Sequence, residues 1–218
     1  MNEDALPSVS SMDALSRLRR FMAPRKFVSS RRELTEAGFD ASRIKNWLRH
    51  GRLVLLLRGV YSFGRDVGSR ESAWRAALLA AGPGSVLNGR SACELWGMIT
   101  PTGEIPRYIE VAVTAGEARR LRGTSPALSR TWINIVKRQF SPEDISRVNG
   151  LEVTSALVAL VDFAAKASPR EVRFAFLEGC RLGLVQKRDV IRLRRLMRGR
   201  RGVEKLNPLV ALWDEIPG

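Results

Sequence analysis

The sequence predicts an α+β protein, with an N-terminal winged helix-turn-helix domain in residues 1–66 and a mixed α+β domain in residues 67–218. Three observations support this prediction. Residues 29–61 contain two short helix patterns around a Gly-containing turn, followed by a β-rich hairpin pattern. Helix and strand patterns alternate irregularly over the remaining chain. The formal net charge of +15 indicates a polyanionic partner, such as nucleic acid or an anionic surface.

Two helices are expected at the start of the N-terminal domain. Apolar residues recur on one face over residues 12–22, which predicts an amphipathic helix there. A second helix is expected over residues 31–37, with Ser29 or Ser30 as its N-cap. Glu33 follows at the spacing of a capping box, so the start of this helix is well defined by local chemistry.

The next helix is the expected recognition helix. It starts after Asp40, with Asp40 or Ser42 as its N-cap, and ends at Gly51. Ile44, Trp47 and Leu48 form its buried stripe, which leaves the other faces free to enter a major groove. The residues expected to contact DNA in this helix are Ser42, Arg43, Lys45, Asn46 and Arg49. The plainer alternative is a basic amphipathic helix that is simply solvated.

Asn46 is informative because it carries no charge. It would add little to non-specific attraction, yet an Asn side chain can bond adenine through two hydrogen bonds, as Arg can bond guanine. Arg31 and Arg32, in the helix before the turn, complete the expected contact set together with two arginines near the following strands.

Those two arginines flank the predicted wing. Residues 53–57 are a run of five apolar residues of strand length, and residues 59–63 resume the strand pattern. The apolar run is more typical of a core than of a contact surface, so no binding role is assigned to it. Arg52 and Arg58 are therefore the residues of the wing that we expect to meet the phosphate backbone or the minor groove.

The second domain is expected to follow a linker at residues 64–70. Its expected elements are helices over 71–81, from Ser91 to Trp96, from Pro142, after 151–155 and from Pro169, with strands over 108–113 and 131–138. The segment between the two strands contains Arg119 and Arg120, and it is expected to be an exposed basic loop. Contact with phosphate and a solvated hairpin connection remain equal alternatives for this loop.

A basic helix is expected over residues 187–201. Val190, Leu193, Leu196 and Met197 maintain a helical apolar stripe, so a folded helix is expected. Its outer face and end would carry Arg192, Arg195, Arg198, Arg200 and Arg201. Together with Arg119 and Arg120, these residues suggest a second basic surface, because a purely structural helix needs far fewer cations.

Several classes of protein are not supported by the sequence. No apolar run approaches the length of a membrane span, and the acidic N-terminus does not resemble a secretory signal, so a cytoplasmic protein is expected. Cys93, Cys180 and His50 are too few for a structural zinc site, and the cysteines are expected to be buried free thiols. No phosphate loop, dinucleotide motif or nucleophile elbow is present, so no cofactor, no catalytic residue and no enzyme activity are expected.

The order of the motifs resembles one protein family. The N-terminal pattern resembles the corresponding domain of AbiEi-type antitoxins, the transcription-repressing antitoxins of type IV toxin–antitoxin systems. It is carried by Ser30–Leu34, Ala37-Gly38, Ile44–Leu53 and Arg58–Tyr61. Further blocks that resemble AbiEi-like regulators are Ala76–Leu87, Ser91-Ala92, Leu95–Gly97, Ser141–Asp144, Val161–Ala164, Leu184-Val185 and Arg200–Gly202. The resemblance runs from about residue 12 over nearly the whole chain.

The chain also departs from this family pattern. Relatives often carry His where Gly89 stands and Arg around residues 156–159, where this chain is apolar. Many relatives continue into a restriction-endonuclease-like tail, and we expect this chain to stop before it. These departures leave any chemistry or fixed contact at those positions unsupported.

The resemblance implies a sequence-specific transcriptional repressor that binds an inverted-repeat operator in double-stranded DNA near its own promoter. It also implies a neighbouring nucleotidyltransferase-like toxin that this antitoxin opposes. Two alternatives stay open. The C-terminal domain could act mainly by binding the toxin or its RNA substrate, or the protein could be a phage or mobile-element repressor that has no toxin.

Overall fold

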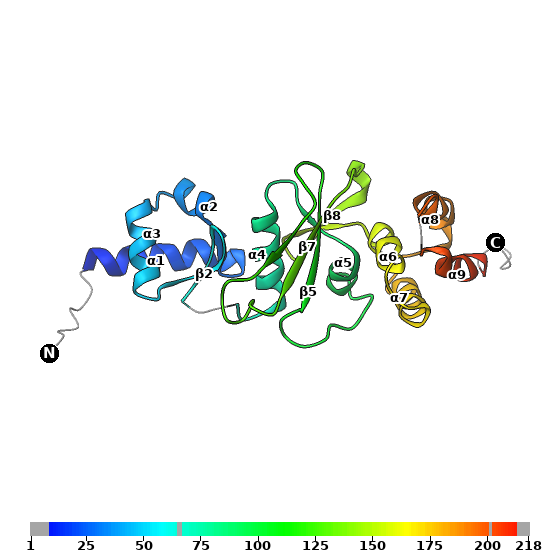
Figure 1. The fold of residues 1–218 in the computed structure, drawn as a ribbon, viewed down its shortest axis with the longest axis horizontal. Coiled ribbons are helices and arrows are strands. Elements are labelled where there is room, and N and C mark those ends of the chain that lie inside the picture. Colours follow the sequence, from blue (N-terminus) through cyan, green and yellow to red (C-terminus); the bar gives the residue numbers. More distant parts are fainter. Residues whose placement is uncertain (1–8, 65–66, 201, 213–218) are drawn as a thin grey trace.

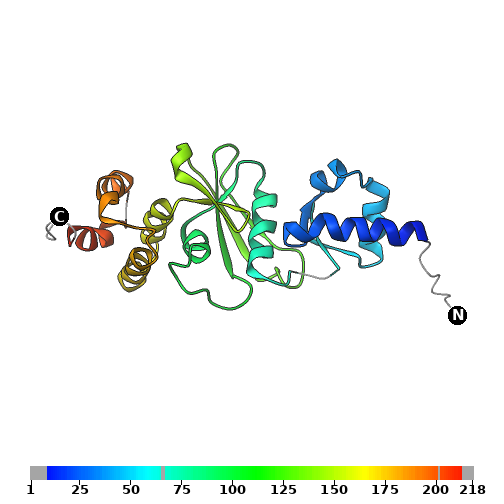
Figure 2. The ribbon, with the colours of Figure 1, turned by 180° about the vertical axis from the view of Figure 1, so that it is seen from behind.

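The computed structural model describes residues 9–64, 67–200 and 202–212, and they form a mixed α+β structure. The elements follow one another along an elongated molecule (Figure 1). Helices α1 and α3 lie at one end, a mixed sheet occupies the middle, and α8 and α9 lie at the other end. The view from behind shows the same order (Figure 2). The two basic helices of the sequence analysis are therefore far apart in space.

The N-terminal part contains helices α1 (Val9–Met22), α2 (Arg31–Glu36) and α3 (Ala41–Arg49), and strands β1 (Val28–Ser30), β2 (Leu53–Leu57) and β3 (Val60–Phe63). The described strands of this part form an antiparallel sheet in the order β1-β3-β2. Ser30 and Glu33 form the expected capping box of α2, and Asp40 caps α3 by accepting from the amide of Arg43. Gly38 adopts a φ of +85° in the turn between the two helices, a conformation that disfavours other residues.

The small antiparallel sheet packs on both of its faces. On one side Leu18, Leu34 and Ile44 pack with Leu53 and Tyr61 in a local core. The residues of the sheet that belong instead to the main core of the molecule are Val28, Leu56, Leu57 and Val60. There they meet α4 (Arg70–Ala81), the first helix after the expected linker. The sheet is thus shared between the N-terminal helices and the rest of the chain.

The main sheet has the order β6-β7-β5-β4-β9-β8 within the described residues. Its strands are β4 (Val86–Leu87), β5 (Tyr108–Val113), β6 (Arg119–Arg122), β7 (Trp132–Lys137), β8 (Ile145–Val148) and β9 (Leu151–Thr154). The pairs β5–β7 and β4–β9 are parallel, and the other pairs are antiparallel. Helices α4 and α5 (Gly89–Leu95) pack against β5. The sheet is followed by α6 (Ala156–Ala164), α7 (Pro169–Arg181), α8 (Val190–Met197) and α9 (Asn207–Ala211).

Two expectations for the second part are wrong. The expected loop between β5 and β7 contains an edge strand, β6, whose Leu121 turns inward while its arginines stay exposed. The helix expected from Pro142 is only the 3-10 turn Pro142–Asp144, followed by β8. Residues 151–154 form β9, because Asn149 and Gly150, both at positive φ, join β8 and β9 in a tight hairpin. The helix expected after residues 151–155 is present as α6.

The cysteines are free: Cys93 is fully buried and Cys180 is half-buried. Burial raises the pKa of both thiols. Across the described residues, no helix is long and apolar enough to cross a membrane.

Candidate nucleic-acid interface

Helix α3 divides into a buried stripe and an exposed face. Ile44 and Trp47 are buried, and the Trp47 ring meets Phe39 edge-on with 5.3 Å between ring centroids. Ser42, Asn46 and Arg49 follow one another at i, i+4 and i+7, so they share the face opposite that stripe. All three are exposed. This division of the helix is the one that the sequence predicts.

The polar side chains of this face are mostly uncommitted. Within the described residues, hydrogen bonds and ion pairs involve none of the side chains of Arg43, Lys45, Asn46 and Arg49. Ser42 is the exception, since its hydroxyl donates to Oδ1 of Asp40 over 2.5 Å. That bond and the amide of Arg43 lower the pKa of Asp40, which stays charged at the helix N-terminus. Helix α3 therefore offers three cations (Arg43, Lys45 and Arg49) and the amide of Asn46 to an external partner.

The remaining candidates of the N-terminal domain do not lie together. Arg52 follows α3 directly, and its amide donates to the carbonyl of Trp47 over 2.8 Å. Arg58 lies beyond the opposite end of β2, roughly 20 Å away for an extended chain. There the amide of Arg31 donates to the carbonyl of Gly59 over 2.7 Å. Arg52 thus belongs with α3, whereas Arg31 and Arg58 form a second exposed group at the hairpin tip.

Arg32 has a local partner. Its Nε donates to Oε1 of Glu36 over 2.7 Å, one helical turn further along α2. Both side chains are exposed, so the pair contributes little to stability and can open for another anion.

The sequence analysis missed two cations near α3. Arg17 and Arg20 of α1 line a shallow pocket of about 310 Å³ with Ala37 and Phe39, which flank the turn before α3. Their position on the polar faces of the first predicted helix was the sequence feature that could have identified them. Arg17 and Arg20 add positive charge beside the turn that precedes α3.

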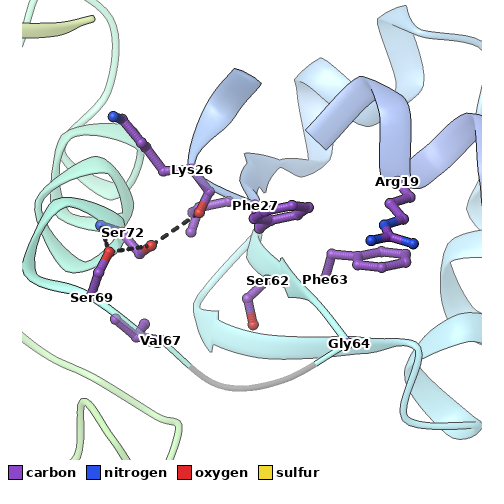
Figure 3. A pocket seen from close by; sticks show the side chains of 11 residues that line it. Arg19, Lys26, Phe27, Ser62, Phe63, Gly64, Val67, Ser69 and Ser72 are labelled. Carbon is purple, nitrogen blue, oxygen red and sulfur yellow. Dashed lines mark hydrogen bonds between the residues drawn. The ribbon is translucent and has the colours of Figure 1, made fainter. Parts of the chain in front are cut away.

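A second pocket, of about 460 Å³, lies where the N-terminal sheet meets α4 (Figure 3). The rings of Phe27 and Phe63 stack there with 6.3 Å between centroids, and Arg19 lies beside Phe63. The hydroxyl of Ser72 donates to the carbonyl of Lys26 over 3.0 Å, which holds the start of α4 against the chain before β1. Lys26 and Phe27 both adopt positive φ, so this junction carries local backbone strain.

The expected second basic surface is not one surface. Arg119 and Arg120 lie on β6, at one edge of the main sheet, whereas α8 lies beyond α6 and α7 at the far end of the molecule (Figure 1). Arg119 donates to the carbonyl of Ala81 over 3.1 Å at the end of α4. Arg120 donates to the side-chain oxygen of Asn134 over 2.8 Å. The two groups of arginines cannot be treated as a single patch.

The prediction of an exposed basic helix through residue 201 is also corrected. Helix α8 ends at Met197, and Arg192 donates to Oδ1 of Asp144 over 2.8 Å. Arg200 turns back to pair with Asp162, which also accepts from Arg138. Burial and the nearby Arg200 lower the pKa of Arg138 to about 10. Arg192 and Arg200 therefore hold the fold together rather than face outward.

Arg195 and Arg198 are exposed at this end of the molecule, and Arg201 lies outside the described residues. In the described part of the chain, His, Cys, Asp and Glu side chains nowhere gather in a group of three or more that could hold a metal ion.

Comparison with known proteins identifies the fold only. No family model and no curated protein matches the chain. Among solved structures, the RV2827C protein from Mycobacterium tuberculosis is similar, with a TM-score of 0.58 and 18% sequence identity. The match covers 97% of this chain and 80% of that protein. At this identity the similarity concerns architecture, and it agrees with a mixed α+β structure.

Proposed function

We propose that the N-terminal part is a winged helix that binds double-stranded DNA in a sequence-specific manner. The observation that carries this proposal is the outward face of α3, where Asn46 and Arg49 lie side by side without intramolecular partners. A surface helix that is only solvated gains nothing from keeping an amide and several cations uncompensated on one face. A recognition helix needs this composition to bond base edges and phosphates.

The arrangement of elements supports the same proposal. The chain order is α1, β1, α2, α3, β2, β3, and β3 lies between β1 and β2 in the antiparallel sheet. In winged helices a helix presented in this way enters the major groove while the hairpin that follows meets the backbone. Arg58, at the β2–β3 turn, would then contact the backbone at a point separate from α3.

We propose that the protein represses transcription, that it has no catalytic activity, and that it acts in the cytoplasm. The resemblance to AbiEi-type antitoxins supports autoregulation of a type IV toxin–antitoxin operon through an inverted-repeat operator. A nucleotidyltransferase-like toxin would be the cognate partner. Arg195 and Arg198, at the far end, would meet DNA only as a separate contact.

The energetics of this binding follow from the distribution of charge. Contacts of Arg43, Lys45 and Arg52 with phosphates would dominate affinity and make it steeply dependent on salt. Asn46 would add discrimination between sequences, because its amide must match one base edge and cannot gain from phosphate charge.

A duplex titration tests the proposal. The probe is the DNA immediately upstream of the gene that encodes this chain, compared with a scrambled duplex of the same length and composition. Binding is measured by fluorescence anisotropy at several salt concentrations. We expect a preference for the upstream duplex at every salt concentration, with affinity for both falling as salt rises. Equal affinity for the two duplexes would disprove sequence-specific binding.

A further inference from the structure

One face of the main sheet is left open at the edge formed by β6 and β7. Tyr108 of β5 and Trp132 of β7 are directly paired, and Trp132 is paired in turn with Arg122 of β6. Tyr108 is 54% exposed, and Arg122 is also exposed. An exposed tyrosine therefore lies beside a half-buried tryptophan on this face of the sheet.

Arginines extend this surface. The guanidinium carbons of Arg120 and Arg122 lie 5.2 Å and 5.3 Å from the centroid of the Trp132 ring. Such contacts hold the guanidinium planes in place while their charge stays uncompensated. In the described structure, no carboxylate pairs with Arg120 or Arg122. Arg120 donates to the side-chain oxygen of Asn134, and Arg122 donates to the carbonyl of Ser129.

A second row of side chains lies next to the first. Glu110, Asn134 and Arg120 are register partners on β5, β7 and β6. Asn134 uses its side-chain oxygen to accept from Arg120, so its amide nitrogen is a free donor among the described groups. This row supplies hydrogen-bonding groups directly beside the aromatic row.

A pocket of about 270 Å³ opens between this face and helices α6 and α7, lined by Tyr108, Glu110, Asn134, Phe163 and Lys166. Glu110 is fixed within it, because its carboxylate accepts from the amide of Arg90 over 2.7 Å and from Lys166. Gly89 leaves room for this position, since a Cβ there would overlap the Glu110 carboxylate, and its φ of +50° disfavours other residues. The pocket thus places the Glu110 carboxylate, a fixed hydrogen-bond acceptor, next to the exposed side chain of Tyr108.

We infer that this face, centred on Tyr108, Trp132 and Arg120, binds single-stranded RNA. Bases stack on exposed aromatic rings and on guanidinium planes, and the uncompensated charge of Arg120 and Arg122 attracts phosphates. A duplex fits poorly, because its bases are already stacked and cannot reach the rings. Stacking is tolerant of sequence, so the surface accepts many single strands.

The carboxylate of Glu110 favours RNA over DNA. A carboxylate repels phosphate, but it can accept a hydrogen bond from the ribose 2′-hydroxyl, a donor that deoxyribose lacks. The site is distinct from α3, which lies at the end of the molecule beyond α4 (Figure 1). Binding here is therefore independent of the DNA contact proposed for the N-terminal part.

The test uses the full chain and a fluorescein-labelled, mixed-sequence RNA single strand of about 12 nucleotides, a length within the usual site size of such surfaces. The same sequence as DNA and a preformed DNA duplex serve as competing probes. We expect the RNA strand to bind several-fold more tightly than its DNA equivalent. Replacing Tyr108 by alanine should weaken RNA binding by about tenfold, because one stacking surface is lost.

Three variants make the result decisive. Phe174→Ala removes a ring that is 52% exposed on α7, and it should leave RNA binding unchanged. Asn46→Ala on α3 should also leave it unchanged, whereas Glu110→Ala, which removes the acceptor, should remove the preference for RNA over DNA. The inference is overturned if Tyr108→Ala binds RNA as the unmodified chain does, if Asn46→Ala loses RNA binding equally, or if RNA and DNA strands bind equally well. Thermal unfolding of each variant verifies that it is folded.

Discussion

Glu33 of α2 and Arg75 of α4 form an ion pair in which Nη2 and Oε1 are 2.6 Å apart. The other oxygen of Glu33 accepts from the amide of Ser30 over 2.8 Å and closes the N-terminal cap of α2. Nε of Arg75 donates to the carbonyl of Val28 in β1 over 2.8 Å. One arginine therefore joins α2 and the N-terminal sheet to the rest of the protein.

We predict that Arg75→Ala destabilises the protein by about 2 kcal/mol, since it removes two hydrogen bonds of a charged group. The side chains of Arg75 and Glu33 are only 17% and 27% exposed, so water replaces these bonds poorly. Urea unfolding measures the change. Arg32→Ala is the matched control, because its pair with Glu36 is solvent-exposed and should contribute less than about 0.5 kcal/mol. Equal effects of the two variants would contradict the structural role of Arg75.

Asn46 and Lys45 should affect DNA binding in different ways. Asn46→Ala is expected to reduce the preference for the upstream duplex by about 1–3 kcal/mol and to leave the salt dependence unchanged. Lys45→Ala should weaken both duplexes alike and lower the salt slope by about 1. Arg173→Ala, an exposed arginine of α7, is the control and should change neither quantity. If Asn46→Ala weakened both duplexes equally, the assignment of Asn46 to base recognition would be wrong.

Asp162 is expected to be important for stability. It accepts from both Arg138 and Arg200, and its side chain is only 13% exposed. Asp162→Asn removes the carboxylate that pairs with both cations, so we expect a loss of about 3 kcal/mol in the free energy of unfolding. Glu152→Gln removes the exposed pair with Arg147 and should cost less than about 0.5 kcal/mol. Denaturant titration of both variants compares them, and a smaller loss for Asp162→Asn than for Glu152→Gln would refute the prediction.

Glu171 should make stability depend on pH in the acid range. The backbone and hydroxyl of Ser168, together with Arg90, lower the pKa of Glu171 from 4.5 to about 2. A carboxyl with a lowered pKa stabilises the fold above its unfolded pKa, and this contribution is lost as pH falls from about 4.5 towards 2. Glu171→Gln should therefore be less stable than the unmodified chain at pH 7, with the difference shrinking below about pH 4.5.

Chemical denaturation at a series of pH values measures this difference. Glu178→Gln serves as a comparison, since Glu178 also has a lowered pKa but pairs with Arg181 within its own helix. A stability difference for Glu171→Gln that stayed constant down to the lowest pH would contradict the assigned pKa.

Much of the N-terminal part could be predicted from the sequence, because its signals are local. The capping box of Ser30 and Glu33, the Gly38 turn and the buried stripe of α3 each involve residues a few positions apart. The hairpin of β8 and β9 was equally readable, since Asn149-Gly150 is a strong hairpin signal. The helix-start pattern at Pro142 gives only a 3-10 turn, and β8 follows it directly.

The second part was harder because its order depends on distant segments. Strand β6 is polar and charged, and only its place at the sheet edge beside β7 makes it a strand. The aromatic row of Tyr108 and Trp132 likewise exists only because β5 and β7 pair in parallel with this register. A strand pattern alone predicts neither the partner nor the exposed face.

By itself, the sequence determined the α+β class, the residues exposed on α3 and the strong positive charge. Tertiary structure alone decided which of those charges are free. Arg192 pairs with Asp144, 48 residues away in the sequence, and Arg200 pairs with Asp162, 38 residues away. Both charges are therefore neutralised by ion pairs within the fold. Lys45 and Arg49 find no such partner in the described structure. The physical reason is that charge composition is additive along a chain, whereas ion pairing requires proximity that only folding creates.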